Sequence, residues 1–86
     1  MTKADNLHVE IISPSGFVFD GYCYLVTIPG TEGDLGIMNN HEPTLAKLRE
    51  GKISIYDENN KIIQDFAVTG GFAQNTEGKL LILLDK

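Results

Sequence analysis

The interpretation of this chain starts from one stretch of ten residues, Ile28-Pro29-Gly30-Thr31-Glu32-Gly33-Asp34-Leu35-Gly36-Ile37. Glycine recurs at every third position, and two acidic residues lie between the glycines. Because glycine permits positive φ and close backbone approach, the pattern predicts a shaped acidic loop, not a regular element, between apolar strands. The stretch contains no lysine and no Gly-Lys-Ser/Thr ending, so it does not match a phosphate-binding loop. We therefore expect a docking surface.

The sequence around this loop alternates between apolar and polar residues with a period of two, as β-strands do. Turn residues recur about every 8–12 positions, which is typical of an antiparallel β-sandwich or barrel. The predicted fold is all-β, an antiparallel β-sandwich of two sheets with Gly-rich connecting loops, in one domain over residues 1–86. Strands are predicted at residues 7–12, 17–28, 37–38, 53–56, 62–68, 72–75 and 79–84.

Two segments depart from simple alternation. The apolar parity changes around Asp20, which predicts a β-bulge at Gly21 within one long bent strand. Residues 44–50 carry Leu45 and Leu48 at helical spacing. Because isolated helices shorter than about 12 residues are marginal, we expect a turn or one helical turn that pins both leucines into the core.

The final strand, residues 80–84, is apolar on both of its faces. A strand of this kind has to be covered on both sides, so it is either central in a sheet or covered by a further element or a partner. The phenylalanines are expected in the core, and they are Phe17, Phe19, Phe66 and Phe72.

Composition narrows the classes of partner. The chain has 86 residues, a formal net charge of −5 and 42% hydrophobic residues. An acidic balance disfavours nucleic acid, whose phosphates require clustered Lys and Arg, and it disfavours direct adsorption to anionic lipid. Residues 1–6 lack the apolar core of a signal peptide, and no apolar run approaches the roughly 20 residues that span a bilayer. A basic protein partner remains compatible.

The residues that carry chemistry are few. Cys23 is the only cysteine and is expected to be a buried hydrophobe. The only histidines, His8 and His41, have no defined third ligand for zinc. Glu32 and Asp34 lack the desolvated pocket that a general acid needs, which leaves a solvated turn or recognition of a cationic group. We therefore expect no catalytic residue, no metal and no cofactor.

Four blocks of the sequence follow one another in order, and they are Val9-Glu10-Ile11-Ile12-Ser13-Pro14, the stretch from Pro29 to Ile37, Asn40-His41-Glu42-Pro43 and Val68-Thr69-Gly70-Gly71-Phe72. Together these blocks resemble the N-terminal β-sandwich domain of the epsilon subunit of bacterial F1Fo ATP synthase. The resemblance covers nearly the whole chain, and Asn40 and Glu42 are departures within the third block.

This resemblance implies a non-catalytic central-stalk (rotor) subunit of a proton-transporting ATP synthase, held at the cytoplasmic face of the bacterial inner membrane through the complex. It implies binding to the gamma subunit and to the c-ring, so that proton flow is coupled to ATP synthesis. The residues carried over for the c-ring contact are Glu32, Gly33 and Asp34, and those for gamma or nearby rotor surface are Ser13, His41 and Pro43.

Epsilon subunits of this family usually continue into a C-terminal helical hairpin, whereas this sequence stops at Lys86. The chain is either a naturally short subunit or a fragment, and in the second case the lost hairpin would explain the doubly apolar last strand. The inhibition and ATP sensing tied to the hairpin are not expected from residues 1–86 alone. The alternative from another class is a free-standing β-sandwich adaptor that binds a basic protein along an edge strand.

Overall fold

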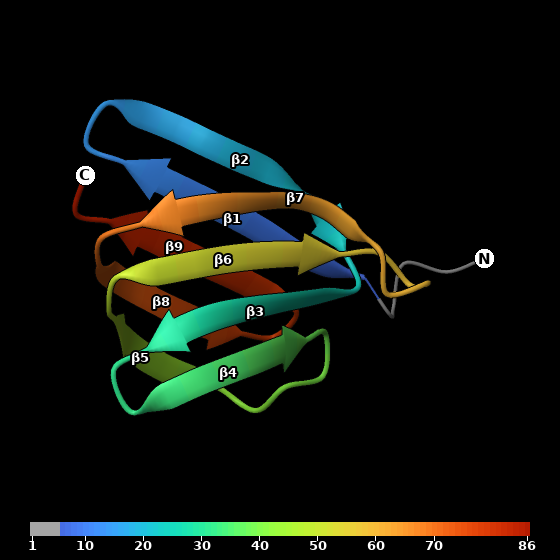
Figure 1. Cartoon of the computed structure of the whole chain (residues 1–86). Helices are drawn as coiled ribbons and strands as arrows, with labels where there is room; N and C mark the ends of the chain where they lie inside the picture. Colours follow the sequence, from blue (N-terminus) through green and yellow to red (C-terminus); the bar gives the residue numbers. More distant parts are fainter. Residues whose placement is uncertain (1–5) are drawn as a thin grey trace.

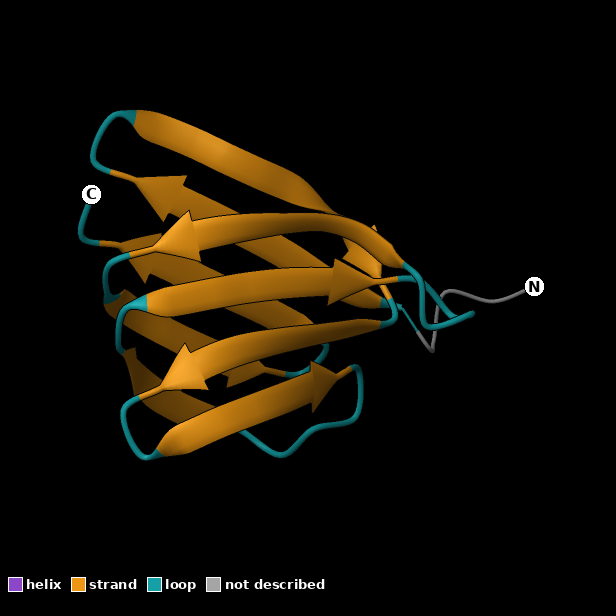
Figure 2. Ribbon diagram, viewed as in Figure 1, coloured by secondary structure: helices purple, strands orange, loops and turns teal. Residues whose placement is uncertain are grey.

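The computed structural model describes residues 6–86, so the expectation about the N-terminal segment falls almost entirely outside the described residues. Within the described part every regular element is a β-strand, as Figure 2 shows. The strands are β1 (Leu7–Ser13), β2 (Gly16–Cys23), β3 (Leu25–Gly30), β4 (Gly33–Met38), β5 (Thr44–Leu48), β6 (Gly51–Tyr56), β7 (Ile62–Val68), β8 (Gly71–Thr76) and β9 (Lys79–Leu84).

The strands form two facing layers (Figure 1), which confirms the predicted all-β sandwich. One layer contains β7, β6, β3 and β4, and the other contains β2, β1, β9, β8 and β5. Hydrogen bonds join both layers into one strongly curled sheet in the order β2-β1-β9-β8-β5-β3-β6-β7, with β4 paired to β3. The pairs are antiparallel except β1 with β9, which run parallel.

The two layers are joined at Gly30, the last residue of β3. Gly30 pairs with Gly33 of β4 and also with Leu48 of β5, which belongs to the other layer. Around this point the Thr31 N–H donates to the Lys47 carbonyl at 2.8 Å, and the Arg49 N–H donates to the Pro29 carbonyl at 2.9 Å. A Cβ on Gly30 would lie 2.6 Å from the Gly33 carbonyl oxygen, so only glycine fits this corner without a shift of the backbone.

The core lies between the layers and is built from the side chains that point inward at alternate positions along the strands. The alternation predicted in the first strand is thereby confirmed, because side chains of a strand point to opposite faces in turn. Its buried members include Val9, Ile11, Val26, Ile28, Ile37, Ile53, Ile55, Leu80 and Ile82.

Strand β9 is central, with β1 on one edge and β8 on the other. Leu80 and Ile82 are fully buried between the layers, whereas Leu83 faces outward and is 47% exposed. The first of the two explanations for the doubly apolar strand therefore holds, and the outer face of this strand remains an apolar surface.

The expectation of a bulge at Gly21 within one long strand is wrong. Ile11 pairs with Phe19 and Ile12 pairs with Phe17, so the inserted residue is Val18. The insertion sends Phe17 to the outer face, where it is 69% exposed, while Phe19 packs against the core. The strand then ends at Cys23, the chain bends, and β3 begins as a separate strand in the other layer.

The expectation of a turn or helical turn at residues 44–50 is also wrong. The segment forms strand β5, which pairs with β8 from Thr44 to Leu48. Residues three apart in a strand face opposite sides, so Leu48 is buried while Leu45 is 71% exposed. Phe72, which pairs with Lys47 on the same outer face, is 51% exposed and is not a core residue.

We predict that Gly30→Ala lowers the free energy of unfolding by about 1–3 kcal/mol, the usual cost of forcing extra atoms into a packed site. Gly36→Ala in the same hairpin is the matched control, because its Cβ would meet only Leu25 Cδ1 at 3.4 Å. We expect that control to change stability by less than about 0.5 kcal/mol. Equal urea midpoints for the two variants would contradict the role of Gly30.

Cys23 is buried in the core, and burial raises the pKa of its thiol from 9.0 to about 11. Between pH 9.0 and about 11 the thiol ionises in the unfolded chain while it stays protonated in the folded one. The unfolded chain therefore binds fewer protons than the folded chain, and stability falls as pH rises. We predict that the stability difference between wild type and Cys23→Ala, measured by urea unfolding, shrinks as pH rises through this window. A difference that stays constant with pH would contradict the assignment.

Candidate functional site

The acidic stretch forms a hairpin in place of the irregular loop expected from its glycines. Pro29 and Gly30 belong to β3, strand β4 starts at Gly33, and only Thr31 and Glu32 form the turn. The φ angle of Gly33 is +131°, in the region that favours glycine, which accounts for one of the three glycines by local geometry. Glu32 therefore lies at the tip of a tight two-residue connection, where it is exposed.

A cleft of about 570 Å³ opens beside this hairpin. It lies between the Gly30–Leu35 side of the hairpin and strand β5, at the seam where β4 and β5 form the edges of the two layers. Acidic side chains of the hairpin border one side, and Lys47 of β5 borders the other. The cleft combines an apolar lining with charged groups at its margin, which suits a protein segment better than a free ion.

The two acids of the hairpin differ in their surroundings. Asp34 Oδ1 accepts a hydrogen bond from Arg49 Nη2 at 2.5 Å, and both side chains are largely exposed. Arg49 also donates to the Glu50 carbonyl at 3.0 Å, which ties the hairpin to the corner between β5 and β6. Among residues 6–86 no ion pair involves Glu32, so its carboxylate is available to a partner. Arg49 was not anticipated from the sequence, since it lies 15 residues from Asp34.

Ser13 lies at the same end of the sandwich as the acidic hairpin. The end of β1 neighbours the end of β9. The end of β9 pairs with the start of β8, which pairs with the end of β5, and the end of β5 pairs with Gly30. The Ser13 hydroxyl donates to the Gly16 carbonyl at 3.2 Å and accepts from the Ser15 N–H at 3.3 Å. Ser13 therefore closes the turn between β1 and β2. We call this end, which carries the β3–β4 turn, the hairpin end.

His41 and Pro43 lie at the opposite end, in the connection between β4 and β5. The His41 N–H donates to the Met38 carbonyl at 3.0 Å, and His41 Nδ1 lies 2.8 Å from the Glu42 carbonyl oxygen. The amide of Asn75, near the end of β8, reaches the same connection. The structure thus brings Ser13 and the acidic residues to one end and separates them from His41 and Pro43.

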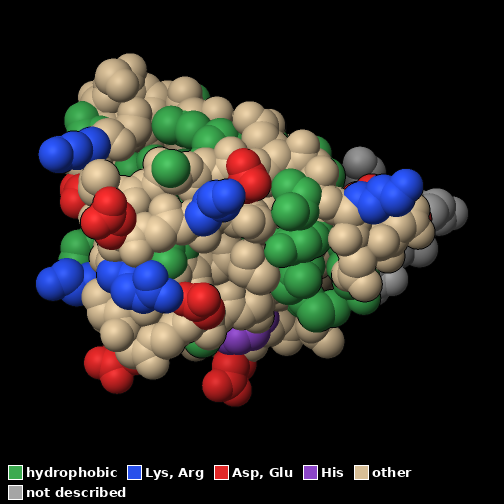
Figure 3. Space-filling model, viewed as in Figure 1, with side chains coloured by type: hydrophobic (Ala, Val, Ile, Leu, Met, Phe, Trp, Pro, Cys, Tyr) green, Lys and Arg blue, Asp and Glu red, His purple; other side chains and the backbone are tan. Residues whose placement is uncertain are grey.

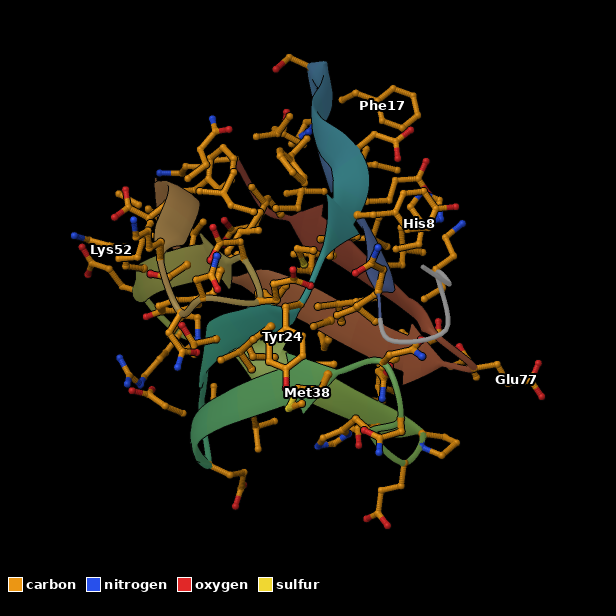
Figure 4. The ribbon with its side chains drawn as sticks, turned by 90° about the vertical axis from the view of Figure 1, so that its right-hand side faces the viewer. His8, Phe17, Tyr24, Met38, Lys52 and Glu77 are labelled. Carbon is orange, nitrogen blue, oxygen red and sulfur yellow. The ribbon has the colours of Figure 1, made fainter. Side chains whose placement is uncertain are left out.

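Outward-facing apolar residues cross the layer that contains β2, β1, β9 and β8. Phe72 pairs with Leu83, Leu83 with Ile12, and Ile12 with Phe17. Figure 4 shows Phe17 and His8 on the same side of the molecule, opposite Lys52 of the other layer. Exposed apolar rows of this kind are typical of interaction surfaces. Sequence reasoning placed Phe17 and Phe72 in the core and so missed this row.

The other layer has its own apolar row, formed by Met38, Leu25, Tyr56 and Ile62 in cross-strand register. Figure 3 shows hydrophobic side chains gathered over the right part of this face, with charged side chains toward the hairpin end. The two apolar rows lie on opposite faces, so the described chain offers protein-type contact surfaces on both sides.

Neither histidine belongs to a metal-type cluster. His8 Nε2 lies 2.8 Å from Asp20 Oδ1, and its ring stacks on Tyr22 with centroids 4.8 Å apart. Across residues 6–86 no group of three or more His, Cys, Asp or Glu side chains is arranged to hold a metal ion. The same residues include no helix that is long and apolar enough to cross a membrane.

Comparisons with known proteins identify relatives of this chain. Residues 6–86 match the family described as ATP synthase, Delta/Epsilon chain, beta-sandwich domain. The chain is 41% identical over 81 residues to the ATP synthase epsilon chain of Campylobacter curvus, covering 94% of this chain and 62% of that one. It is 37% identical over 83 residues to the epsilon chain of Rhodospirillum rubrum, covering 96% and 61%. The chain thus spans about three fifths of the length of these relatives.

Solved structures support the same fold. A chain of the Euglena gracilis mitochondrial ATP synthase OSCP/F1/c-ring structure superposes with a TM-score of 0.85 at 23% identity, covering 94% of this chain and 51% of that chain. A chain of the Tetrahymena thermophila mitochondrial ATP synthase central stalk/c-ring structure gives a TM-score of 0.73 at 24% identity, covering 99% and 67%.

At these identities the structural matches establish the fold alone, while the sequence match over residues 6–86 establishes the family. The resemblance found in the four sequence blocks is thereby confirmed. The chain belongs to the ATP synthase delta/epsilon chain family and comprises its β-sandwich domain.

Proposed function

We propose that this chain is a non-catalytic central-stalk subunit of a proton-transporting F1Fo ATP synthase, at the cytoplasmic face of a bacterial inner membrane. In this proposal it binds the gamma subunit and the c-ring and couples proton flow to ATP synthesis. Membership of the delta/epsilon family and the bacterial epsilon chains among its relatives support this role.

The observation that carries the proposal is the exposed acid at the tip of the β3–β4 hairpin. The proposed c-ring contact consists of Glu32, Gly33 and Asp34. Of the two acids, Glu32 has no ion-pair partner among residues 6–86, and the carboxylate of Asp34 is already paired with Arg49. A negative group at a tight turn complements a basic side chain, and such complementarity sets orientation and encounter rate more than affinity.

The proposed contact with gamma or nearby rotor surface involves Ser13, His41 and Pro43. His41 and Pro43 lie at the end away from the hairpin, so one partner surface can meet them while another meets Glu32. Ser13 lies at the hairpin end and is therefore better suited to rotor surface next to the c-ring. A sandwich joined into one continuous sheet can pass torque between two such contacts without a hinge.

We predict that Glu32→Lys weakens binding of the chain to a detergent-solubilised c-ring of its complex. Exposed charge pairs contribute about 0.2–1 kcal/mol each, so loss of this attraction lowers affinity by about 1.4- to 5-fold, and the repulsion that lysine introduces adds to the loss. Glu58→Lys, an exposed acid in the β6–β7 turn at the other end, makes the same change in net charge and serves as the matched control. Binding is measured by biolayer interferometry at low and high salt.

The wild type should lose affinity with rising salt more steeply than Glu32→Lys, because salt screens exposed charges. Equal losses for the two lysine variants would assign the effect to net charge and contradict a contact at Glu32. Absence of wild-type binding to both the c-ring and the gamma subunit would reject the proposed function itself.

A further inference from the structure

Asn75 is the most completely buried polar residue of the described chain, with 1% of its surface exposed. It lies in β8 on the inward face, two residues after the buried Ala73. Its Nδ2 donates to the His41 carbonyl at 3.1 Å and to the Glu42 carbonyl at 2.8 Å. Because a carbonyl oxygen only accepts, these two contacts settle which end of the amide is the nitrogen.

The Glu42 carbonyl is the point where the connection between β4 and β5 is held together. Besides Asn75, it accepts from the Thr44 hydroxyl at 3.0 Å and lies 2.8 Å from His41 Nδ1. The same ring nitrogen lies 3.2 Å from Asn75 Nδ2 and 3.5 Å from the Thr44 hydroxyl, so Nδ1 is the ring nitrogen that faces this cluster. His41 Nε2 is then the ring nitrogen left to face a partner.

The side-chain oxygen of Asn75, Oδ1, indicates that packing in the core is not the reason for an asparagine at this position. Asn75 Oδ1 is buried and has no hydrogen-bond partner among residues 6–86. A buried carbonyl without a partner is unfavourable, and an apolar residue of similar size fills an inward strand position at no such cost. The amide therefore contributes what an apolar residue cannot, which is the pair of hydrogen bonds to residues 41 and 42.

We propose that Asn75 is a positioning residue that fixes the connection at residues 39–43 and thereby presents His41 and Pro43 to the protein partner. This inference rests on the proposed contact between those residues and the gamma subunit. The hydrogen bonds of Asn75 hold the backbone of the connection in its bound form before the partner arrives. Order that is already present does not have to be created on binding, so the amide contributes to affinity without touching the partner.

The test uses the full 86-residue chain and the purified gamma subunit of its complex. Asn75→Val removes both hydrogen bonds and keeps an apolar side chain in the core, and Asn75→Ala removes them without adding methyl groups. Ser54→Ala is the matched control, because Ser54 is also a buried polar residue but lies in β6 of the other layer. Three quantities are measured for each variant: the affinity for gamma, the Tm and the ring nitrogen NMR signals of His41.

We expect Asn75→Val and Asn75→Ala to bind gamma about tenfold more weakly, a change that corresponds to loss of a preorganised contact. We expect the Tm of Asn75→Val to equal or exceed that of the wild type, since the unpaired carbonyl is gone. The His41 ring nitrogen signals should change, because Nδ1 loses its contact with Asn75 Nδ2 and the Glu42 carbonyl is no longer held in place. Ser54→Ala should match the wild type in affinity and in its ring signals.

Affinities of the Asn75 variants within about twofold of the wild type, with unchanged His41 signals, would overturn the inference. A parallel fall of affinity and Tm in the Asn75 variants and in Ser54→Ala would overturn it too, because that result describes a general loss of core stability. Failure of the proposed function has a different signature, in which His41→Ala binds gamma as well as the wild type does. In that case a shifted His41 spectrum in Asn75→Val still upholds the positioning role.

Discussion

The structure depends on a close approach of backbones at Gly30, where strand β3 leaves one layer and pairs with β5 of the other. Gly30 pairs with residues of two different strands, and a side chain at this point would collide with the Gly33 carbonyl. Since the hairpin that follows begins at this corner, the same constraint sets where Glu32 points. Gly30 and Gly33 thus serve the fold first, and the exposed acid is presented as a consequence.

The separation of the hairpin end from the His41 end is the feature of the fold that suits it to hold two partners. Nine strands joined in one curled sheet form a stiff body, 36 Å in its longest dimension, with different chemistry at each end. The hairpin end carries exposed charge, and only part of it is neutralised, by Arg49. At the His41 end, the buried amide of Asn75 donates hydrogen bonds to the connection between β4 and β5. A body of this kind can hold two partners at once and move as a unit between them.

Much of the fold could be predicted, because alternation in residues such as Val9, Ile11, Ile53 and Ile55 reports burial directly. The turn ending at Asn60 falls between two of the predicted strands, and the φ of Asn60 is 63°, a conformation that asparagine tolerates. A change of parity shows that a residue is inserted but not which one, so Val18 was mistaken for Gly21. The contacts of Asp34 with Arg49 and of His41 with Asn75 join residues 15 and 34 positions apart, beyond the reach of any local pattern.

Hydrogen–deuterium exchange of the chain, alone and bound to the c-ring or to gamma, tests most directly whether the two ends meet different partners. The account predicts that the c-ring slows exchange of the backbone amides at residues 31–35, and that gamma slows exchange at residues 39–43. Protection of the same end by both partners, or of neither end by either partner, would contradict it.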